Sequence, residues 1–287
     1  MNPPISIVIR TFNSARTLDQ AIGRLGLREL DEVIVVDSGS RDSTLKIAEK
    51  HGAKIIMAGG PFNYSKSLNL GFRAAKNPWV LVISSHSIPL VPNFLDIYRR
   101  TVATFPNDVV VSYGPNTLTG KSELQQESEG VSYYDREDYL KIEPEAGNGN
   151  AIYRRTAWQE HSFSEAIRTG EDKLWLKEML KWNFRIAYIP AARTVNRNQG
   201  SLLYMFRKAY SEARSAERGP NHRPMKLWHL GGALKNLAVK KLRGQIDMGN
   251  WARHSSHTFG QFFGSRGRQN NSPEWKCDAS GSTDAPS

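Results

Sequence analysis

VIVVDSGSRDST, residues 33–44, is a run of aliphatic residues that meets a turn rich in Ser, Gly and Asp and then enters a helix-like segment. The same order of apolar run, polar turn and helical pattern occurs before it from ISIVI (5–9) and after it from KIIMA (54–58) and WVLVIS (79–84). Continuous apolar strands that alternate with helices are typical of a parallel sheet covered on both faces. The chain is therefore expected to be an α/β protein with a Rossmann-like, mostly parallel sheet flanked by helices.

The pattern continues at VVVSYG (109–114) and RIAYIP (185–190), which we expect to be strands, and at 171–183, which we expect to be an amphipathic helix. The polar segment 115–147 indicates loops with one short helix. Ligands of such sheets bind beyond the carboxyl ends of the strands. The three predicted strand ends Thr11–Asn13, Asp37–Ser40 and Ser84–Ser87 should therefore lie at one crevice.

The net charge of +11 is unevenly distributed along the 287 residues. Residues 1–196 hold 24 Lys and Arg against 22 Asp and Glu, whereas residues 197–268 hold 14 against 3. A nearly neutral body with a basic appendage argues against nucleic acid as the partner of the body and for a local anionic contact. We accordingly predict a catalytic domain over 1–200, a basic amphipathic helical extension over 201–263 and a disordered tail over 264–287.

Other features of the composition limit the class and the compartment. With 39% apolar residues the chain can form a sizeable core, and its single cysteine excludes an internal disulfide framework. No apolar run approaches the roughly 18–20 residues of a spanning helix, and the N-terminus lacks a secretory signal pattern. These features predict a cytoplasmic protein.

Four blocks of the sequence together resemble the successive motifs of the family 2 glycosyltransferases. They are SIVIRTFN, VIVVDSGSRDST, NYSKSLNLGFRAAKNPWVLVIS and GEDKLWLKEMLKWNFRIAYIPAA, which span about residues 5–200 in the expected order. The resemblance implies the GT-A nucleotide-sugar fold and an inverting transfer reaction. Within the family, the combination of F-x-Y…LN-x-G, S-x-H-x-x-P and ED-x-x-W is most similar to the rhamnosyltransferase-like branch of polysaccharide assembly.

The resemblance also implies which residues bind the donor, a dTDP- or UDP-sugar. The acid that matches Asp37 accepts a hydrogen bond from the imide N–H of the base in the family, although an Asx-type turn would favour the same residue. Asn69 and Gly71 match the family's N-x-G, where a small residue lets the backbone approach the ribose and diphosphate. The expected donor-binding residues are Thr11, Asn13, Asp37, Ser40, Asn69, Gly71, Ser84 and His86.

The fourth strand departs from the family pattern. The family usually has Asp-x-Asp there to hold Mg²⁺ or Mn²⁺, whereas this chain has Ser84-Ser85-His86. The histidines that complete the family's metal site are also replaced, by the stretch Val195–Asn198. His86 is kept as a candidate metal ligand or phosphate donor, but the sequence favours a weakly bound divalent cation or none.

The acid pair Glu171-Asp172 is the catalytic candidate. In the family this motif supplies the general base, a role that we assign to Asp172; helix-dipole stabilisation alone would also favour acids in a first turn. Trp175, one turn later, is placed to stack on a sugar, although this helical spacing is also typical of a core residue. Asn148 and Asn150 match positions that line the acceptor side of the family's site.

The basic segment 201–263 has apolar residues on one helical face and Lys and Arg around it, which suits an anionic membrane surface. A helical cap packed on the catalytic body would show the same pattern. A lipid-linked or glycan acceptor would make a peripheral position at the inner face of the cell membrane reasonable.

Two alternatives to a glycosyltransferase remain open on the sequence. A sugar-phosphate nucleotidyltransferase would need a Gly-rich loop after the first strand, which IRTFNSAR does not supply. A degenerate GT-A module that binds a nucleotide or a partner without turnover would explain the missing Asp-x-Asp, but not the intact acid pair.

Overall fold

The structure, a computed structural model, describes residues 2–117, 130–142, 147–167 and 170–197, together with the isolated positions 210, 255, 258 and 259. The chain divides into two compact units, residues 1–198 and residues 199–287. The predicted basic extension (201–263) and tail (264–287) therefore lie outside the described residues, except at those isolated positions. Among the described residues, no helix is both long and apolar enough to cross a bilayer.

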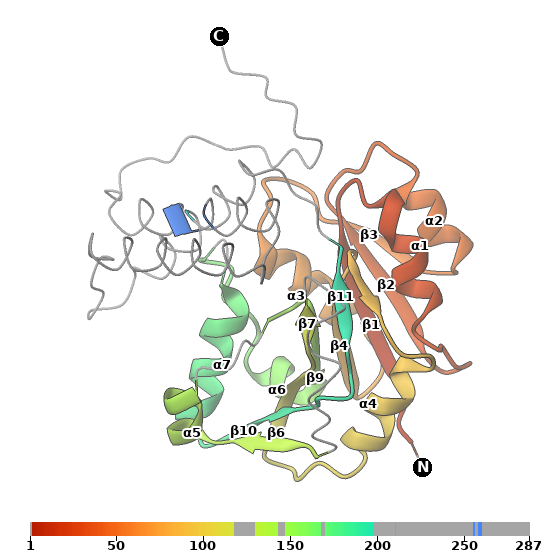
Figure 1. Cartoon of the computed structure of the whole chain (residues 1–287). Coiled ribbons are helices and arrows are strands. Elements are labelled where there is room, and N and C mark those ends of the chain that lie inside the picture. Colours follow the sequence, from red (N-terminus) through yellow and green to blue (C-terminus); the bar gives the residue numbers. More distant parts are fainter. Residues whose placement is uncertain are drawn as a thin grey trace, which may run out of the picture. The chain divides into compact units, whose positions relative to one another are not determined.

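The first unit is built on a large sheet, and six of its eight described strands follow the predicted apolar runs (Figure 1). The strand at 132–134 lies in the segment 115–147 that was expected to form loops and one short helix, and the strand at 150–154 was not predicted. In spatial order the sheet is β3-β2-β1-β4-β9-β6-β10-β8. Its strands are β1 (Ile5–Thr11), β2 (Glu32–Asp37), β3 (Lys54–Met57), β4 (Trp79–Ser84), β6 (Val109–Tyr113), β8 (Ser132–Tyr134), β9 (Asn150–Arg154) and β10 (Arg185–Tyr188).

The sheet is mostly parallel, as expected, with β9 and β8 as its antiparallel strands. A small second sheet, in the order β5-β11-β7, was not predicted. Its strands are β5 (Ser87–Pro89), β7 (Asn116–Thr117) and β11 (Thr194–Asn196), which are too short to show an apolar alternation.

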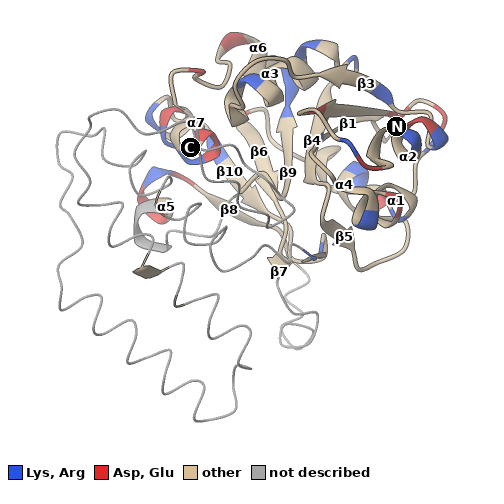
Figure 2. Cartoon of the chain, turned by 90° about the horizontal axis from the view of Figure 1, so that it is seen from above, with Lys and Arg blue, Asp and Glu red and all other residues tan. Residues whose placement is uncertain are grey.

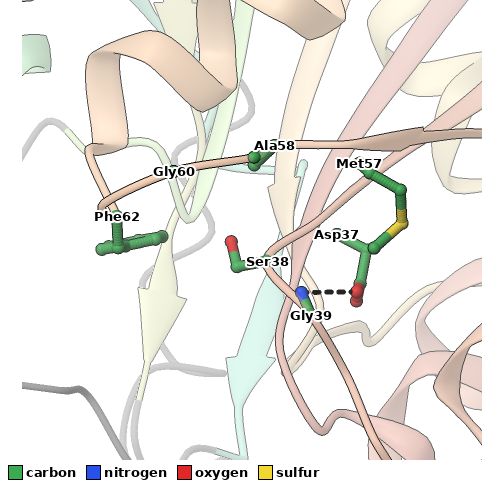
Figure 3. Close-up of a pocket in the computed structure, with 8 residues that line it drawn as sticks. Asp37, Ser38, Gly39, Met57, Ala58, Gly60 and Phe62 are labelled. Carbon is green, nitrogen blue, oxygen red and sulfur yellow. Dashed lines mark hydrogen bonds between the residues drawn. The ribbon is translucent and has the colours of Figure 1, made fainter.

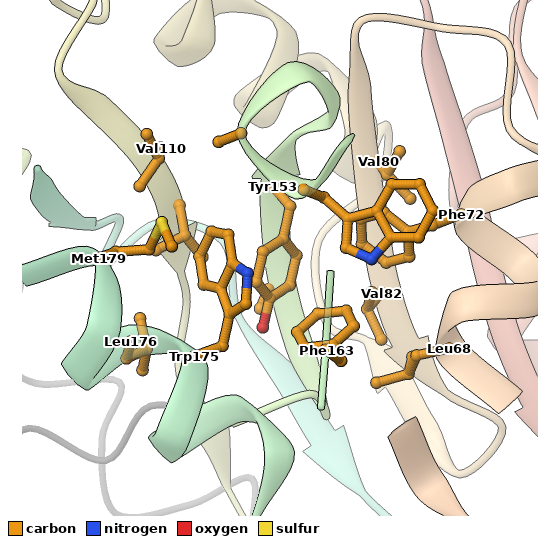
Figure 4. Close-up of a cluster of buried hydrophobic side chains, with 14 of the residues drawn as sticks. Leu68, Phe72, Val80, Val82, Val110, Tyr153, Phe163, Trp175, Leu176 and Met179 are labelled. Carbon is orange, nitrogen blue, oxygen red and sulfur yellow. The ribbon is translucent and has the colours of Figure 1, made fainter. Parts of the chain in front are cut away.

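Helices cover both faces of the large sheet, because side chains alternate between the faces along each strand. Ile5, Ile7 and Ile9 of β1 pack in one core cluster with α1 (Ala15–Gly23), α2 (Thr44–Lys50) and α4 (Phe94–Val102). Val8 packs in the other cluster with α3 (Tyr64–Ala74), α5 (Arg136–Ile142), α6 (Arg155–Glu160) and α7 (Glu171–Lys181). Figure 4 shows this second cluster, which joins α3 and α7 across β9.

Basic and acidic residues are interspersed over the described helices and loops (Figure 2), which agrees with the nearly neutral charge of residues 1–196. The positions that matter for function are the carboxyl ends of β1, β2 and β4. These three strands are neighbours in parallel register, so their ends meet at one edge of the sheet. The crevice expected from the sequence begins at this edge.

Candidate active site

Asp37 organises the loop that follows β2. Its Oδ1 accepts hydrogen bonds from the backbone N–H groups of Gly39 and Ser40, at 2.8 and 2.7 Å. Its Oδ2 accepts from the Thr11 hydroxyl at 2.8 Å and from the Ser40 hydroxyl at 2.5 Å. The side chain is fully buried and its four acceptor sites are all used within the chain. Asp37 therefore holds the loop, and a base could bond to it only by displacing one of these donors.

Asn13 connects the loop after β1 to the loop after β2. It adopts a left-handed conformation with a φ of 46°, in which its backbone N–H donates to the Ser40 hydroxyl at 2.8 Å. Its side-chain Oδ1 accepts from the backbone N–H of Arg41 at 2.9 Å. The predicted residues Thr11, Asn13, Asp37 and Ser40 thus lie together, and their described hydrogen bonds stabilise two loops against each other.

A pocket opens beside this loop (Figure 3). Its volume is about 200 Å³, smaller than the roughly 300–1,000 Å³ of pockets that hold a whole small ligand, so it suits one part of a larger ligand. Ser38 carries its hydroxyl toward this opening. Asp37, Ser38, Gly39, Met57, Ala58, Gly59, Gly60 and Phe62 line the pocket.

Met57 and Phe62 are apolar residues that the sequence analysis did not select. Their side chains stay 55% and 37% exposed, which is unusual for large apolar residues near a concave surface. A signal was present in the sequence, since both flank a Gly-rich loop after a strand that ends at the same edge. Apolar walls around a polar loop suit an aromatic ring.

Ser84 and His86 lie at the end of β4 and just beyond it. The backbone N–H of Ser84 donates to the carbonyl of Gly149 at 3.2 Å, and the carbonyl of His86 accepts from the N–H of Arg197 at 2.7 Å. The buried Ser85 hydroxyl contacts His86 Nδ1 at 3.3 Å and the Ser14 hydroxyl at 2.8 Å. This chain of serines orients the His86 ring.

The donor atoms around His86 do not fit the usual site for Mg²⁺ or Mn²⁺, which prefer several carboxylate oxygens. Within the described ranges, no three His, Cys, Asp or Glu side chains lie close enough together to hold a metal ion. The role of His86 as a ligand stays a prediction.

Asn69 and Gly71 make packing contacts in place of the expected approach to the donor. The Asn69 amide donates to the Phe163 carbonyl and to Glu165 Oε1, both at 2.9 Å, and its oxygen accepts from Trp158 Nε1 at 3.0 Å. A Cβ on Gly71 would lie 2.4 Å from Val8 Cγ1, so this glycine lets α3 pack closely on β1. We therefore do not assign these two residues to the donor site.

The acid pair Glu171-Asp172 begins α7 and is held by Asn148. The Asn148 side-chain amide donates to Glu171 Oε1 at 3.0 Å, and its backbone N–H donates to Asp172 Oδ2 at 3.1 Å. Tyr153 OH donates to Asn148 Oδ1 at 2.7 Å, which fixes the orientation of the amide. Asn148 therefore contacts both acids at once.

The two acids differ in exposure. Glu171 is only 4% exposed, and burial raises the pKa of its carboxyl, opposed by the nearby Arg10 and reinforced by the negative charge of Asp172. Asp172 is half-buried, and its second oxygen accepts from the backbone N–H of Lys173 at 2.8 Å. The described residues thus use two of the four acceptor sites of the Asp172 carboxylate.

Arg10 links the acid pair to the sheet edge, and the sequence analysis missed it. Its Nη1 lies 3.5 Å from Glu171 Oε1, and its guanidinium lies 4.6 Å from the ring centre of Tyr64. A charged residue near the end of an apolar strand was the available signal. Its partner follows 161 residues later in the chain, which no local pattern reveals.

Asn150 and Trp175 do not line the acceptor side as expected. The Asn150 amide donates to the carbonyls of Ala192 and Pro115 at 2.7 and 3.3 Å, and its oxygen accepts from Tyr98 OH at 2.7 Å. Trp175 is 1% exposed and lies in the core, where its ring contacts those of Tyr153 and Phe163 (Figure 4). A sugar cannot stack on this buried ring.

The sheet topology is that of a GT-A-like α/β fold. The fold carries a pocket beside β2 and an acid pair near the end of β1. A family model described as glycosyl transferase family 2 matches residues 6–161, more than half of the chain. The chain belongs to this family.

Curated and solved relatives agree with this assignment. The succinoglycan biosynthesis protein ExoO of Rhizobium meliloti (strain 1021) is 24% identical over 269 residues, which cover 85% of this chain and 76% of that protein. The mannosyltransferase PcManGT of Pyrobaculum calidifontis, solved with GDP-Man and Mn²⁺, superposes with a TM-score of 0.63 at 12% identity, covering 91% of this chain and 86% of that one. The S. aureus TarS fragment 1–349, solved with UDP, gives 0.54 at 17% identity, covering 91% and 90%. At such identities the superpositions show the fold alone.

Proposed function

We propose that this chain is an inverting glycosyltransferase that moves a sugar from a nucleoside-diphosphate donor to a glycan or lipid-linked acceptor in polysaccharide assembly. Membership of family 2 and the likeness to a succinoglycan biosynthesis protein support this class of reaction. The observation that carries the proposal is the 3.5 Å contact between Glu171 and Arg10, the penultimate residue of β1. This contact brings an acid pair to the edge where a donor would bind.

In the proposed mechanism Asp172 is the general base. It accepts the proton of an acceptor hydroxyl while that oxygen attacks the anomeric carbon. The new bond joins the acceptor oxygen to the sugar, the bond from the sugar to the diphosphate breaks, and the nucleoside diphosphate leaves with that electron pair. A single displacement of this kind inverts the anomeric centre.

The proposed position of the nucleobase is the pocket beside the Asp37 loop. Met57 and Phe62 offer apolar contact to a planar ring, and Ser38 offers a hydroxyl. Because Asp37 uses its four acceptor sites within the chain, we assign base recognition to Ser38 and to the backbone of residues 37–39. This replaces the direct contact between Asp37 and the base that the sequence suggested.

The proposed donor is a UDP- or dTDP-sugar, with dTDP-rhamnose as a primary candidate because of the motif resemblance. The mechanism includes no metal-dependent step, since Ser84, Ser85 and His86 do not form a carboxylate site. The predicted contact of 201–263 with an anionic membrane remains part of the proposal for a lipid-linked acceptor.

The test is calorimetric titration of the purified chain with UDP, dTDP, GDP and CDP, each with Mn²⁺ and each with EDTA. We expect selective binding of UDP or dTDP, with an affinity that Mn²⁺ changes little. Slow hydrolysis of the matching nucleotide-sugar should accompany it. Absence of binding to any of the four nucleotides in both conditions would contradict the proposal, and binding without hydrolysis would favour a module without turnover.

A further inference from the structure

Arg10 occupies an unusual place for a cation. It lies on β1 with the parity of Val8, so its side chain points to the sheet face that α3 and α7 cover. The side chain is only 18% exposed. One face of its guanidinium lies over the ring of Tyr64, the first residue of α3, and one end faces Glu171, the first residue of α7. The cation therefore joins two helices at the strand end.

The contact between Arg10 and Glu171 acts through charge. Its length of 3.5 Å exceeds that of a good hydrogen bond, and Arg10 Nη1 has no hydrogen-bond partner among the described residues although it is buried. The Glu171 side chain is 5% exposed, so little water screens the pair. By contrast, the ion pair of Arg73 and Glu165 has side chains that are 58% and 43% exposed. Surface pairs of that kind contribute little.

The charge of Glu171 affects how strongly Asn148 is held. As a carboxylate, Glu171 accepts the Asn148 side-chain amide, which leaves Asn148 Oδ1 to accept from Tyr153 OH. A protonated Glu171 would still accept at its carbonyl oxygen, but the hydrogen bond from the Asn148 amide would lose the charge of the carboxylate and become weaker. Asn148 also donates its backbone N–H to Asp172. The state of Glu171 is thus transmitted to the proposed base.

We propose that Arg10 is a positioning residue that keeps Glu171 in its carboxylate form and thereby fixes Asn148 against Asp172. The catalytic consequence of this inference rests on the proposed function. The effect of Arg10 on Glu171 and Asn148 does not, because it is present in the protein without a ligand. Among the residues that the structure describes, the ionisable groups around Glu171 are Arg10 from β1, Asp172 from α7 and Tyr153 from β9. Arg10 is the cation among them. Burial and Asp172 both favour the protonated acid, and Arg10 opposes them.

The test is a carbon NMR titration of the whole chain labelled at the Glu side-chain carboxyl carbon. The resonance that disappears in Glu171→Gln identifies Glu171. In Arg10→Met we expect the titration midpoint of Glu171 to move to higher pH, and in Arg10→Lys to stay close to wild type. Arg73→Met is the matched control, since it removes the same charge from α3 at an exposed pair, and it should leave the midpoint unchanged.

The outcomes separate this inference from the proposed function. An unchanged midpoint in folded Arg10→Met would overturn the positioning role. An unchanged midpoint together with loss of UDP affinity but retained uridine affinity would also overturn it and assign Arg10 to the diphosphate. If Arg10→Met does not fold, Arg10→Lys decides. A Glu171 titration midpoint in Arg10→Lys at or below the wild-type midpoint supports the inference, and a large upward shift of that midpoint contradicts it. Failure of all nucleotides to bind wild type would remove the proposed function without altering the Glu171 titration.

Discussion

Two carboxylates lie at the same edge of the sheet, and their surroundings differ. Asp37, after β2, is fully buried and accepts four hydrogen bonds from its own loop and from Thr11. Asp172, at the start of α7, is half-buried and accepts two, both from backbone N–H groups. The family resemblance implies a ligand role for both residues. In the structure the first acid holds its own loop, and in the proposed mechanism the second acid accepts the proton.

The difference teaches how to read a matched motif. A carboxylate whose acceptor sites are all used stabilises the fold, because a ligand must first displace an existing donor. A carboxylate held by only two backbone donors keeps its position and can still accept a proton. The predictions that follow begin with the structural acid and the packing around it and end with the reactive acid.

The largest effect on stability should come from Asp37→Asn. An amide presents one oxygen and one NH₂ group to four donors, so part of the network loses its acceptor in a buried site. With about 1–3 kcal/mol for each unsatisfied buried group, we expect the free energy of unfolding to fall by roughly 2–5 kcal/mol. Urea unfolding of both proteins measures this change in the free energy of unfolding. A loss under about 0.5 kcal/mol would remove the distinction between the two acids.

Gly71→Ala should cost somewhat less. The added Cβ would meet Val8 Cγ1 at 2.4 Å, and overpacking of this kind costs about 1–3 kcal/mol. The affinity of the folded fraction for UDP should stay at the wild-type value, because the contact is with the sheet. Weaker UDP binding at unchanged stability would return Gly71 to the donor site.

Thr11→Val should have a smaller effect, since it removes one donor to Asp37 and leaves three. We expect a loss of about 0.5–1.5 kcal/mol in the free energy of unfolding. Thr11→Ser, which keeps the hydroxyl, serves as the control and should restore most of it. Equal losses in both variants would mean that the methyl group, and not the hydrogen bond, matters.

The smallest effect should be the pH dependence of stability that Glu171 causes. Burial raises the pKa of this carboxyl in the folded chain, so its contribution to stability is complete below the pKa of the unfolded chain and is lost as pH rises through the folded value. Relative to Glu171→Gln, wild type should therefore lose stability across that interval. Unfolding at several pH values measures this, with the exposed Glu49→Gln as control. A wild-type stability that rises with pH relative to Glu171→Gln would mean that folding lowers the pKa of Glu171.

The fold followed from the sequence because its signals are local. The apolar runs that became β1, β2, β3, β4, β6 and β10 are each readable by themselves. The contacts of the site are not local: Asp37 pairs with Thr11, 26 residues away, and Asn69 with Phe163, 94 residues away. Helical spacing could not decide whether Trp175 faces a sugar or the core. Arg10 went unnoticed because its partner is known only once β1 and α7 are folded together.

The central claim is that Asp172 performs the chemistry without holding the fold, and Asp172→Asn tests it most directly. Asp138→Asn is the matched control, because Asp138 also stands in the first turn of a helix, α5. The rate of nucleotide-sugar hydrolysis should be measured together with UDP affinity and urea unfolding. We predict that Asp172→Asn loses about 10²–10⁴-fold in rate while its UDP affinity matches that of wild type and its free energy of unfolding falls by no more than about 1 kcal/mol, as in Asp138→Asn. A rate within a fewfold of wild type in folded, UDP-binding Asp172→Asn would contradict the account.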